Sequence, residues 1–228
     1  MSDVTSDQTG PILSGPERPP ASGGPARQLV VFLHGLGADG GDLIELSAHW
    51  SHRLPDAHFV APNGPEACDM APMGYQWFSL RDRSPEQMVK GAERARAALD
   101  SYLDAELARF GLTDAALALV GFSQGTMTAL HTAPRRCSPC AGLVGFSGAL
   151  IAPERLADEA LSRPPCLLFH GSADEVVPPD SLFAALEPLG GAGINVEWHI
   201  VPGLGHGIDP DGLTQASNFL AARFTPAA

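Results

Sequence analysis

The sequence lacks any long hydrophobic run. No stretch approaches the roughly 18 apolar residues that a membrane-spanning helix needs, so we expect no membrane span. Residues 1–10 are polar and acidic, and they lack the charged and apolar regions of a secretory signal. The prediction for location is therefore cytoplasmic.

Basic residues are scarce. The chain has 14 Lys and Arg against 26 Asp and Glu, which gives a formal net charge of −12. Nucleic acids and anionic membrane surfaces both require a basic face, so we expect neither as a partner. Net charge does not describe one pocket, and it selects no substrate.

Cysteines are few, and only one pair has a suggestive spacing. Cys137 and Cys140 form a CxxC, which is compatible with a redox pair, with half of a zinc site, or with two free thiols. No second CxxC or CxxH could complete a tetrahedral site, and neither HExxH nor a carboxylate cluster occurs. We predict no metal and no cofactor.

The length of 228 residues suits one domain. Residues 1–27 are rich in Pro, Gly and Ser, and we expect a partly mobile N-terminal segment with a short edge strand at residues 10–13. The domain should then occupy residues 28–228.

Apolar strand patterns alternate with helical patterns along that domain. Strands that are apolar throughout indicate a parallel sheet covered on both faces, so the predicted class is α/β with a doubly wound, mostly parallel sheet. The expected strands are 29–33, 58–61, 116–121, 142–146, 166–170 and 194–201, and the expected helices are 42–54, 85–110, 124–133, 179–189 and 211–224.

A G-x-S-x-G pentapeptide lies between the predicted strand 116–121 and the predicted helix 124–133. In that context the motif forms a sharp turn that raises Ser123 above the sheet. Side chains at positions 121 and 125 would clash with neighbouring elements, which explains the glycines. Ser123 is the predicted nucleophile.

A serine hydroxyl needs a base, and the base needs an orienting acid, in the chain order Ser, Asp or Glu, His. Asp174 and His206 fit this order, each following a later strand. Asp180 is the main rival acid, although it looks like a helix N-cap, and Asp209 is too close to His206 in sequence.

Acyl transfer also requires donors for the oxyanion. We expect the backbone N–H of Gln124 and that of Leu36, in the glycine-rich loop after the first strand. We expect His34 to shape this loop and His170 to be structural.

The long loop 63–84 is rich in large apolar side chains, among them Met70, Met73, Trp77 and Phe78. Such side chains either cover the core or line a pocket near the site. We favour a pocket wall for Met73 and Trp77, with plain packing as the alternative.

Five segments together resemble the phospholipase/carboxylesterase branch of the α/β-hydrolases, which includes bacterial carboxylesterases and acyl-protein thioesterases. The resemblance covers roughly residues 28–224, and the segments are 32–40, 75–78, 121–125, 170–178 and 205–207.

The resemblance implies a compact hydrolase without a large cap domain. It also implies the catalytic triad Ser123, Asp174 and His206, and the oxyanion donors Leu36 and Gln124. The loop around Trp77 should border the substrate pocket, so the expected substrate-binding residues are Met73, Trp77, Phe78 and Gly37. Many members form homodimers, and a homodimer is an expectation here.

The predicted function is that of a serine carboxylesterase, which hydrolyses small carboxylic esters through an acyl-enzyme on Ser123. Alternatives are an acyl-protein thioesterase or a lysophospholipase-like enzyme. A peptidase would need a propeller or cap domain to select peptides. A non-catalytic binding protein on the same fold usually loses a triad member, whereas all three candidates are present.

Overall fold

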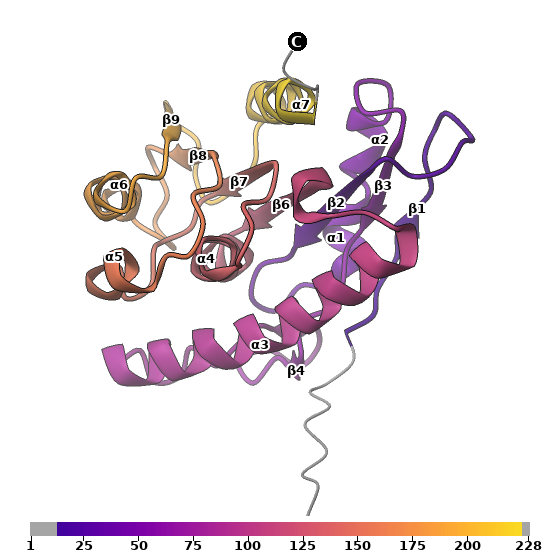
Figure 1. Ribbon diagram of the computed structural model, residues 1–228. Coiled ribbons are helices and arrows are strands. Elements are labelled where there is room, and N and C mark those ends of the chain that lie inside the picture. The colour runs from indigo at the N-terminus through magenta and orange to yellow at the C-terminus, as the bar shows by residue number, and fades with distance from the viewer. Residues whose placement is uncertain (1–12, 225–228) are drawn as a thin grey trace, which may run out of the picture.

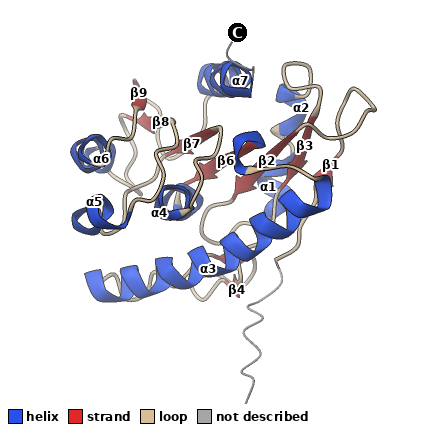
Figure 2. Ribbon diagram, in the orientation of Figure 1, coloured by secondary structure: helices blue, strands red, loops and turns tan. Residues whose placement is uncertain are grey.

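The computed structural model describes residues 13–224, which contain a seven-stranded sheet in the order β1-β3-β2-β6-β7-β8-β9. All neighbouring pairs from β3 to β9 are parallel, whereas β1 pairs antiparallel with β3. Figures 1 and 2 show helices on both sides of these strands, which confirms the predicted doubly wound sheet. The strands are β1 (Glu17–Arg18), β2 (Gln28–Leu33), β3 (Ala57–Val60), β6 (Leu117–Phe122), β7 (Gly142–Phe146), β8 (Cys166–Gly171) and β9 (Val196–Val201).

The strands alternate their side chains between two buried clusters, as the pleat requires. Leu29, Val31 and Leu33 face a first cluster formed with α3, α4 and α6, whereas Val30 and Phe32 face a second cluster formed with α1, α2 and α7. The helices are α1 (Gly40–Ile44), α2 (Ser47–Trp50), α3 (Pro85–Phe110), α4 (Gln124–Thr132), α5 (Leu156–Glu159), α6 (Asp180–Gly191) and α7 (Pro210–Phe224), with short 3₁₀ turns at 114–116, 133–135 and 153–155.

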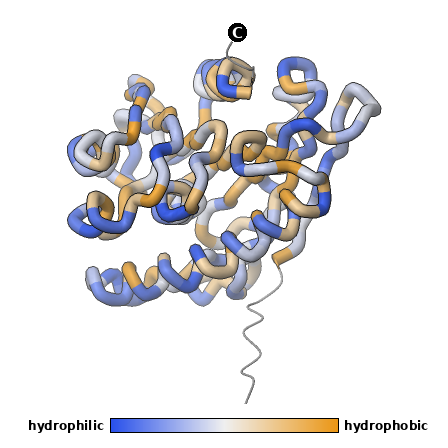
Figure 3. The backbone as a smooth tube through the Cα atoms, viewed as in Figure 1, coloured by the Kyte–Doolittle hydropathy of each residue, from blue (hydrophilic) through white to orange (hydrophobic). Residues whose placement is uncertain are grey.

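The longest helix, α3, has the bounds that its sequence predicts. Pro85 occupies the first helical position, where a missing N–H does no harm, and Gly111 ends the helix with φ +66°. Its buried face is made of Ala and Leu residues and Gly91. Figure 3 accordingly shows α3 alternating between hydrophilic and hydrophobic colour, whereas the central strands are mostly hydrophobic.

The predicted helix 42–54 is divided into α1 and α2. The hydroxyl of Ser47 donates to the carbonyl of Ile44, and the amide of Leu46 donates to the carbonyl of Leu43. These i→i−3 bonds tighten the backbone between the two helices and interrupt the α-helical pattern.

The N-terminal segment differs from its prediction where it is described. Residues 10–12 of the expected edge strand lie outside the described residues, and Leu13 is buried without forming a strand. The edge strand is instead β1, and the amide of Ala61 donates to the carbonyl of Pro16 at 3.0 Å. A strand of two residues carries no periodicity that a sequence could reveal.

The long connection between β3 and α3 holds a small two-stranded sheet. Its strands are β4 (Glu66–Ala67) and β5 (Tyr75–Gln76), which pair antiparallel. Between residues 13 and 224 no connection is large enough to form a cap domain. None of the helices in this range has the length and apolar character that crossing a membrane requires.

Candidate active site

A cavity of about 590 Å³ opens at the edge of the sheet where β2, β6 and β8 end. This is the edge at which open parallel sheets bind ligands. Ser123 and His206 both line it, as does Leu36. Its other lining residues are His34, Gly35, Ala38, Asp42, Leu43, Leu80, Arg83, Met88, Phe122, Met127, Ala149, Val176, Val177, Pro178, Ser181 and Ile208.

Ser123 lies between β6 and α4 in a strained conformation, with φ 54° and ψ −116°. Such a conformation persists only where the surroundings enforce it. A Cβ at Gly125 would lie 1.8 Å from the carbonyl oxygen of Leu33, and one at Gly121 would lie 2.4 Å from the amide of Thr126. The two glycines are therefore required for the turn, as the motif predicts.

His206 and Asp174 meet although they follow different strands. Nδ1 of His206 lies 2.8 Å from Oδ2 of Asp174. The other carboxylate oxygen, Oδ1, accepts the amides of Val176 and Val177, each at 2.9 Å. The side chain of Asp174 is fully buried and that of His206 is 18% exposed, so the imidazole lies at the cavity and the carboxylate behind it.

The hydrogen bonds of Asp174 decide its charge. Burial alone would raise its pKa, but the bonds from His206 and from the amides of Val177 and Val176 outweigh burial and lower the pKa. Asp174 is thus a carboxylate at neutral pH and can only accept. Nδ1 of His206 must carry the hydrogen, which leaves Nε2 as the unprotonated nitrogen of the neutral ring.

His170 also touches this carboxylate. Its Nε2 donates to the carbonyl of Val177 at 2.8 Å and lies 3.3 Å from Oδ2 of Asp174. The ring is buried, so it fixes the loop that presents Asp174. The sequence predicts only a structural histidine here, because its spacing from Asp174 does not reveal this contact.

The loop after β2 is pinned by the β5 segment. The amide of Gly37 donates to the carbonyl of Tyr75 at 2.9 Å, and the amide of Tyr75 donates to the carbonyl of Ala38 at 2.8 Å. Gly37 has φ +79°, which favours glycine. The backbone of Leu36 thus directly precedes two residues, Gly37 and Ala38, that are anchored to Tyr75.

His34 shapes this loop, as expected. Its Nδ1 donates to the carbonyl of Gly35 at 2.7 Å, and its Nε2 accepts the amide of Gly64 at 2.8 Å. Burial lowers the pKa of His34, so the ring is neutral and both nitrogens are satisfied.

Gln124 ties the turn at Ser123 to the long loop. Its amide oxygen accepts the backbone N–H of Trp77 at 2.9 Å, and its amide nitrogen donates to the carbonyl of Phe78 at 2.6 Å. The indole N–H of Trp77 donates to the carbonyl of His34 at 3.0 Å. The sequence analysis predicts a role only for the backbone N–H of Gln124 and does not predict these hydrogen bonds of its side chain.

The four expected substrate-binding residues lie outside the cavity lining. Trp77 and Phe78 are fully buried in the first cluster, Met73 is 80% exposed, and Gly37 lies in the pinned loop. Trp77 and Phe78 therefore pack in the core, which is the alternative to a pocket wall that the sequence leaves open for this loop. Their apolar character could not distinguish a core residue from a pocket wall, because their neighbours in the first cluster and the side chain of Gln124 that binds their backbone are distant in sequence.

The remaining candidates lie elsewhere. Asp180 is exposed at the start of α6, and Asp209 accepts the amide of Gly212 at 3.2 Å beside the start of α7. Cys137 is exposed and Cys140 is buried, and both are free thiols. Across residues 13–224 no group of three or more His, Cys, Asp or Glu side chains could hold a metal ion.

Comparison with known proteins gives consistent matches. The family model described as Phospholipase/Carboxylesterase matches residues 20–224. Esterase YpfH of Escherichia coli (strain K12) is 30% identical over 190 residues, which cover 81% of this chain and 78% of that protein. Acyl-protein thioesterase 1 of Gibberella zeae is 26% identical over 214 residues, which cover 86% of this chain and 91% of that protein.

Solved structures agree. A crystal structure of esterase PE8 matches with a TM-score of 0.88 and 46% sequence identity, covering 92% of this chain and 99% of that chain. Zea mays acyl-protein thioesterase 2 has a similar fold, with a TM-score of 0.77 at 24% identity and coverage of 92% and 98%. This chain therefore belongs to the phospholipase/carboxylesterase family of α/β-hydrolases, a family of ester hydrolases.

Proposed function

We propose that this protein is a serine carboxylesterase that cleaves small carboxylic esters through an acyl-enzyme on Ser123. The observation that carries the proposal is the strained Ser123 at a cavity that it shares with His206, whose ring is hydrogen-bonded to Asp174. A nucleophile, a base and an orienting acid are the parts that acyl transfer needs.

In the proposed mechanism, Nε2 of His206 takes the proton of the Ser123 hydroxyl as its oxygen attacks the ester carbonyl. The backbone N–H groups of Leu36 and Gln124 stabilise the oxyanion. His206 then gives its proton to the leaving alcohol. In the second step the same ring activates water, which releases the acid and restores Ser123. Asp174 holds the ring and stabilises its positive charge.

The position of the oxyanion donors supports this mechanism. Leu36 lines the cavity in the pinned loop, and Gln124 is the first residue of α4, where backbone N–H groups have no partner within the helix. Loss of one such donor weakens transition-state stabilisation by about 3 kcal/mol. The rigid anchoring of both segments keeps these donors in place before substrate binds.

The decisive test is Ser123→Ala, assayed with p-nitrophenyl butyrate. We expect kcat to fall at least about 10⁴-fold while the circular dichroism spectrum is unchanged, because removal of a triad member leaves only the residual effects of binding and the oxyanion donors. A fluorophosphonate probe should label the wild-type protein and not the variant. Ser101→Ala, on the exposed side of α3, is the matched control and should keep both properties. Undiminished turnover by Ser123→Ala would refute the proposal.

A second candidate is hydrolysis of thioesters on acylated proteins. Relatives named acyl-protein thioesterase favour it, as does the apolar character of part of the cavity, where Met88 and Met127 can adapt to an acyl chain. A series of p-nitrophenyl esters from acetate to palmitate separates the candidates. A maximum of kcat/KM at short chains supports the small-ester esterase, and a maximum at palmitate supports the thioesterase.

A further inference from the structure

The cavity extends to both sides of Ser123, and its two ends belong to different hydrophobic clusters. At one end Met127 and Val177 belong to the first cluster, and Leu80 and Met88 pack against it. We call this the α3 end. At the other end Leu43 belongs to the second cluster and Ile208 packs against it, and we call this the α1 end.

The proposed function, on which this inference rests, assigns a role to each end. The ring of His206 lies 4.9 Å from that of Phe122, which packs with Ile208 against the second cluster. His206 is therefore on the side of the α1 end. Because it must protonate the leaving group, the alcohol occupies the α1 end and the acyl group occupies the α3 end.

Each end carries one exposed charge. Arg83 is the single Lys or Arg among the lining residues. It lies at the α3 end beside Leu80, because its Nε donates a hydrogen bond to the carbonyl of Leu80 at 3.4 Å. Asp42 lies at the α1 end next to Leu43. Neither Arg83 nor Asp42 belongs to an ion pair within residues 13–224.

The neighbours of Arg83 are occupied elsewhere, which leaves its guanidinium available. Arg81 pairs with Asp69 at 3.5 Å, and Asp82 accepts the amide of Ser84 at 2.8 Å. The positive N-terminal end of α3 starts at Pro85, two residues further on, and adds to the same potential. Among the residues that line the cavity, the α3 end therefore carries one positive and no negative side chain, in a protein whose net charge is −12.

We propose that Arg83 is a specificity-determining residue that favours esters whose acyl chain ends in a carboxylate. An acyl chain in the α3 end would lie against Leu80 and Met88, and its terminal carboxylate would reach the guanidinium, whose donors match a carboxylate in two-point contact. Asp42 disfavours an anionic leaving group and leaves neutral alcohols unaffected. The preferred substrate class is therefore the monoester of a dicarboxylic acid with a neutral alcohol.

The test compares mono-p-nitrophenyl suberate with p-nitrophenyl octanoate. Both have an eight-carbon acyl chain and the same leaving group, and they differ in the terminal carboxylate. The readout is the ratio of kcat/KM for suberate to that for octanoate. We expect Arg83→Gln to lower this ratio about fivefold and Arg83→Glu to lower it about tenfold or more, because an exposed ion pair is lost and then reversed. The difference between wild type and variants should shrink in 1 M NaCl.

Arg53→Gln is the matched control. Arg53 is exposed after α2 and is not among the cavity-lining residues, so this variant makes the same change in net charge without touching the α3 end. It should keep the wild-type ratio. If Arg83→Gln and Arg83→Glu both cleave the two esters with the wild-type ratio of kcat/KM, the inference is overturned. A wild-type protein that cleaves p-nitrophenyl butyrate but neither eight-carbon ester also overturns the inference, whereas failure to cleave p-nitrophenyl butyrate contradicts the proposed function.

Discussion

Two histidine–carboxylate pairs occupy different regions of this protein, and their burial is reversed. In the first pair, at the candidate active site, Nδ1 of His206 lies 2.8 Å from Oδ2 of Asp174, with side-chain exposures of 18% and 0%. In the second pair, Nε2 of His131 on α4 lies 3.1 Å from Glu93 on α3, with exposures of 0% and 31%. The chemical groups are the same, but in the first pair the acid is buried and in the second the base is buried.

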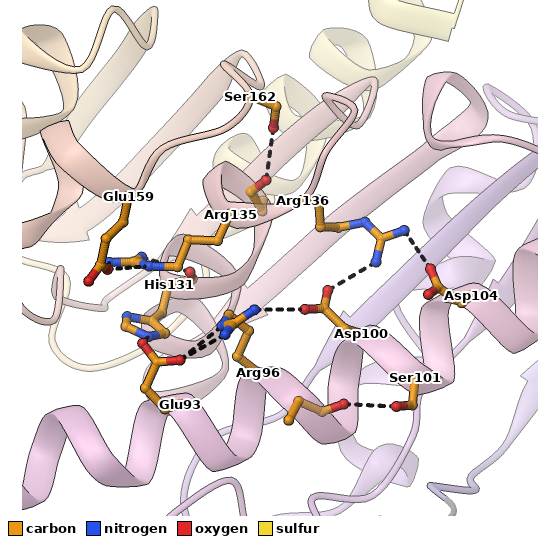
Figure 4. Close-up of polar contacts among 12 residues, drawn as sticks. Glu93, Arg96, Asp100, Ser101, Asp104, His131, Arg135, Arg136, Glu159 and Ser162 are labelled. Atoms are coloured by element: carbon orange, nitrogen blue, oxygen red, sulfur yellow. Dashed lines mark hydrogen bonds and ion pairs between the residues drawn. The ribbon is translucent and has the colours of Figure 1, made fainter.

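The partners of each pair explain what it can do. Asp174 is satisfied by His206 and by the amides of Val176 and Val177, so the partly exposed ring of His206 keeps its other nitrogen for the proposed proton transfer. In the second pair the exposed member is the acid. Figure 4 shows Glu93 between His131 and Arg96, in a network that joins α3 to the end of α4.

The buried ring of His131 has no such use. Its Nδ1 has no hydrogen-bond partner within the described residues. Burial and the nearby Arg135 lower its pKa, and Glu93 only partly opposes them. Burial of the acid therefore leaves a histidine at the cavity that can serve as the proposed base, whereas burial of the histidine makes a structural contact. The comparison predicts that the first pair controls rate and the second controls stability.

The largest expected effect is that of Asp174→Asn on rate. The amide of Asn can donate to Nδ1 of His206, which would place the ring hydrogen on Nε2 and remove the base. By analogy with the corresponding change in a serine protease, kcat for p-nitrophenyl butyrate should fall about 10⁴-fold.

The matched control is Glu93→Gln in the second pair. It makes the same change from carboxylate to amide, next to a histidine that does not line the cavity, and kcat should stay within about twofold of wild type. Equal losses of kcat in the two variants would end the distinction between the pairs.

The next largest effect concerns stability in the region of the second pair. Arg136 follows α4 in the chain, and its side chain is 8% exposed while it contacts Asp100, Asp104 and Asp114 at 3.0, 2.8 and 2.6 Å. Burial raises the pKa of Asp100, although Arg136 opposes this rise, so removal of the guanidinium leaves a half-buried carboxylate that is paired only with Arg96, at 3.3 Å.

We expect Arg136→Met to lower the free energy of unfolding by about 3 kcal/mol in urea at pH 7.5. kcat measured on the folded variant at low temperature should be unchanged. Arg223→Met is the control, because Arg223 and its partner Glu197 are much more exposed, and it should lower stability by less than about 1 kcal/mol. If Arg136→Met is as stable as that control, the network contributes nothing to stability.

The sequence predicts the elements whose ends carry local signals. Pro85 and Gly111 limit α3, and the strained turn at Ser123 follows from its two flanking glycines. The pairing of Asp174 with His206 follows from their positions after β8 and β9, because the carboxyl ends of parallel strands meet at one edge.

Features that depend on distant partners could not be predicted in this way. Trp77 is buried in the first cluster, where the side chain of Gln124 accepts its backbone N–H and the carbonyl of His34 accepts its indole N–H, and neither residue is near it in sequence. The same holds for Arg83, whose place at the cavity depends on the packing of the long loop. The local sequence pattern indicates which residues could be catalytic, whereas tertiary packing decides which of them come into contact.

The smallest expected effect is on the pH dependence of stability, and it tests the second pair directly. An unfolded chain protonates His131 below a pKa of about 6.5, whereas the native ring resists protonation because its pKa is lowered. The unfolded state then binds more protons, so this group stabilises the native state fully above pH 6.5. That contribution is lost as the pH falls toward the native pKa, and it should decrease by up to about 1.4 kcal/mol between pH 7.5 and pH 5.5.

His131→Gln removes this group, so its free energy of unfolding should decrease less than that of wild type over the same pH range. Urea denaturation at both pH values measures the difference. The exposed His52, changed to Gln, is the matched control and should keep the wild-type slope. If His131→Gln also keeps the wild-type slope, then the native ring accepts a proton as readily as the unfolded one. In that case burial would not make the proton affinity of His131 lower in the native state than in the unfolded state, and the contrast drawn between the two pairs would fail.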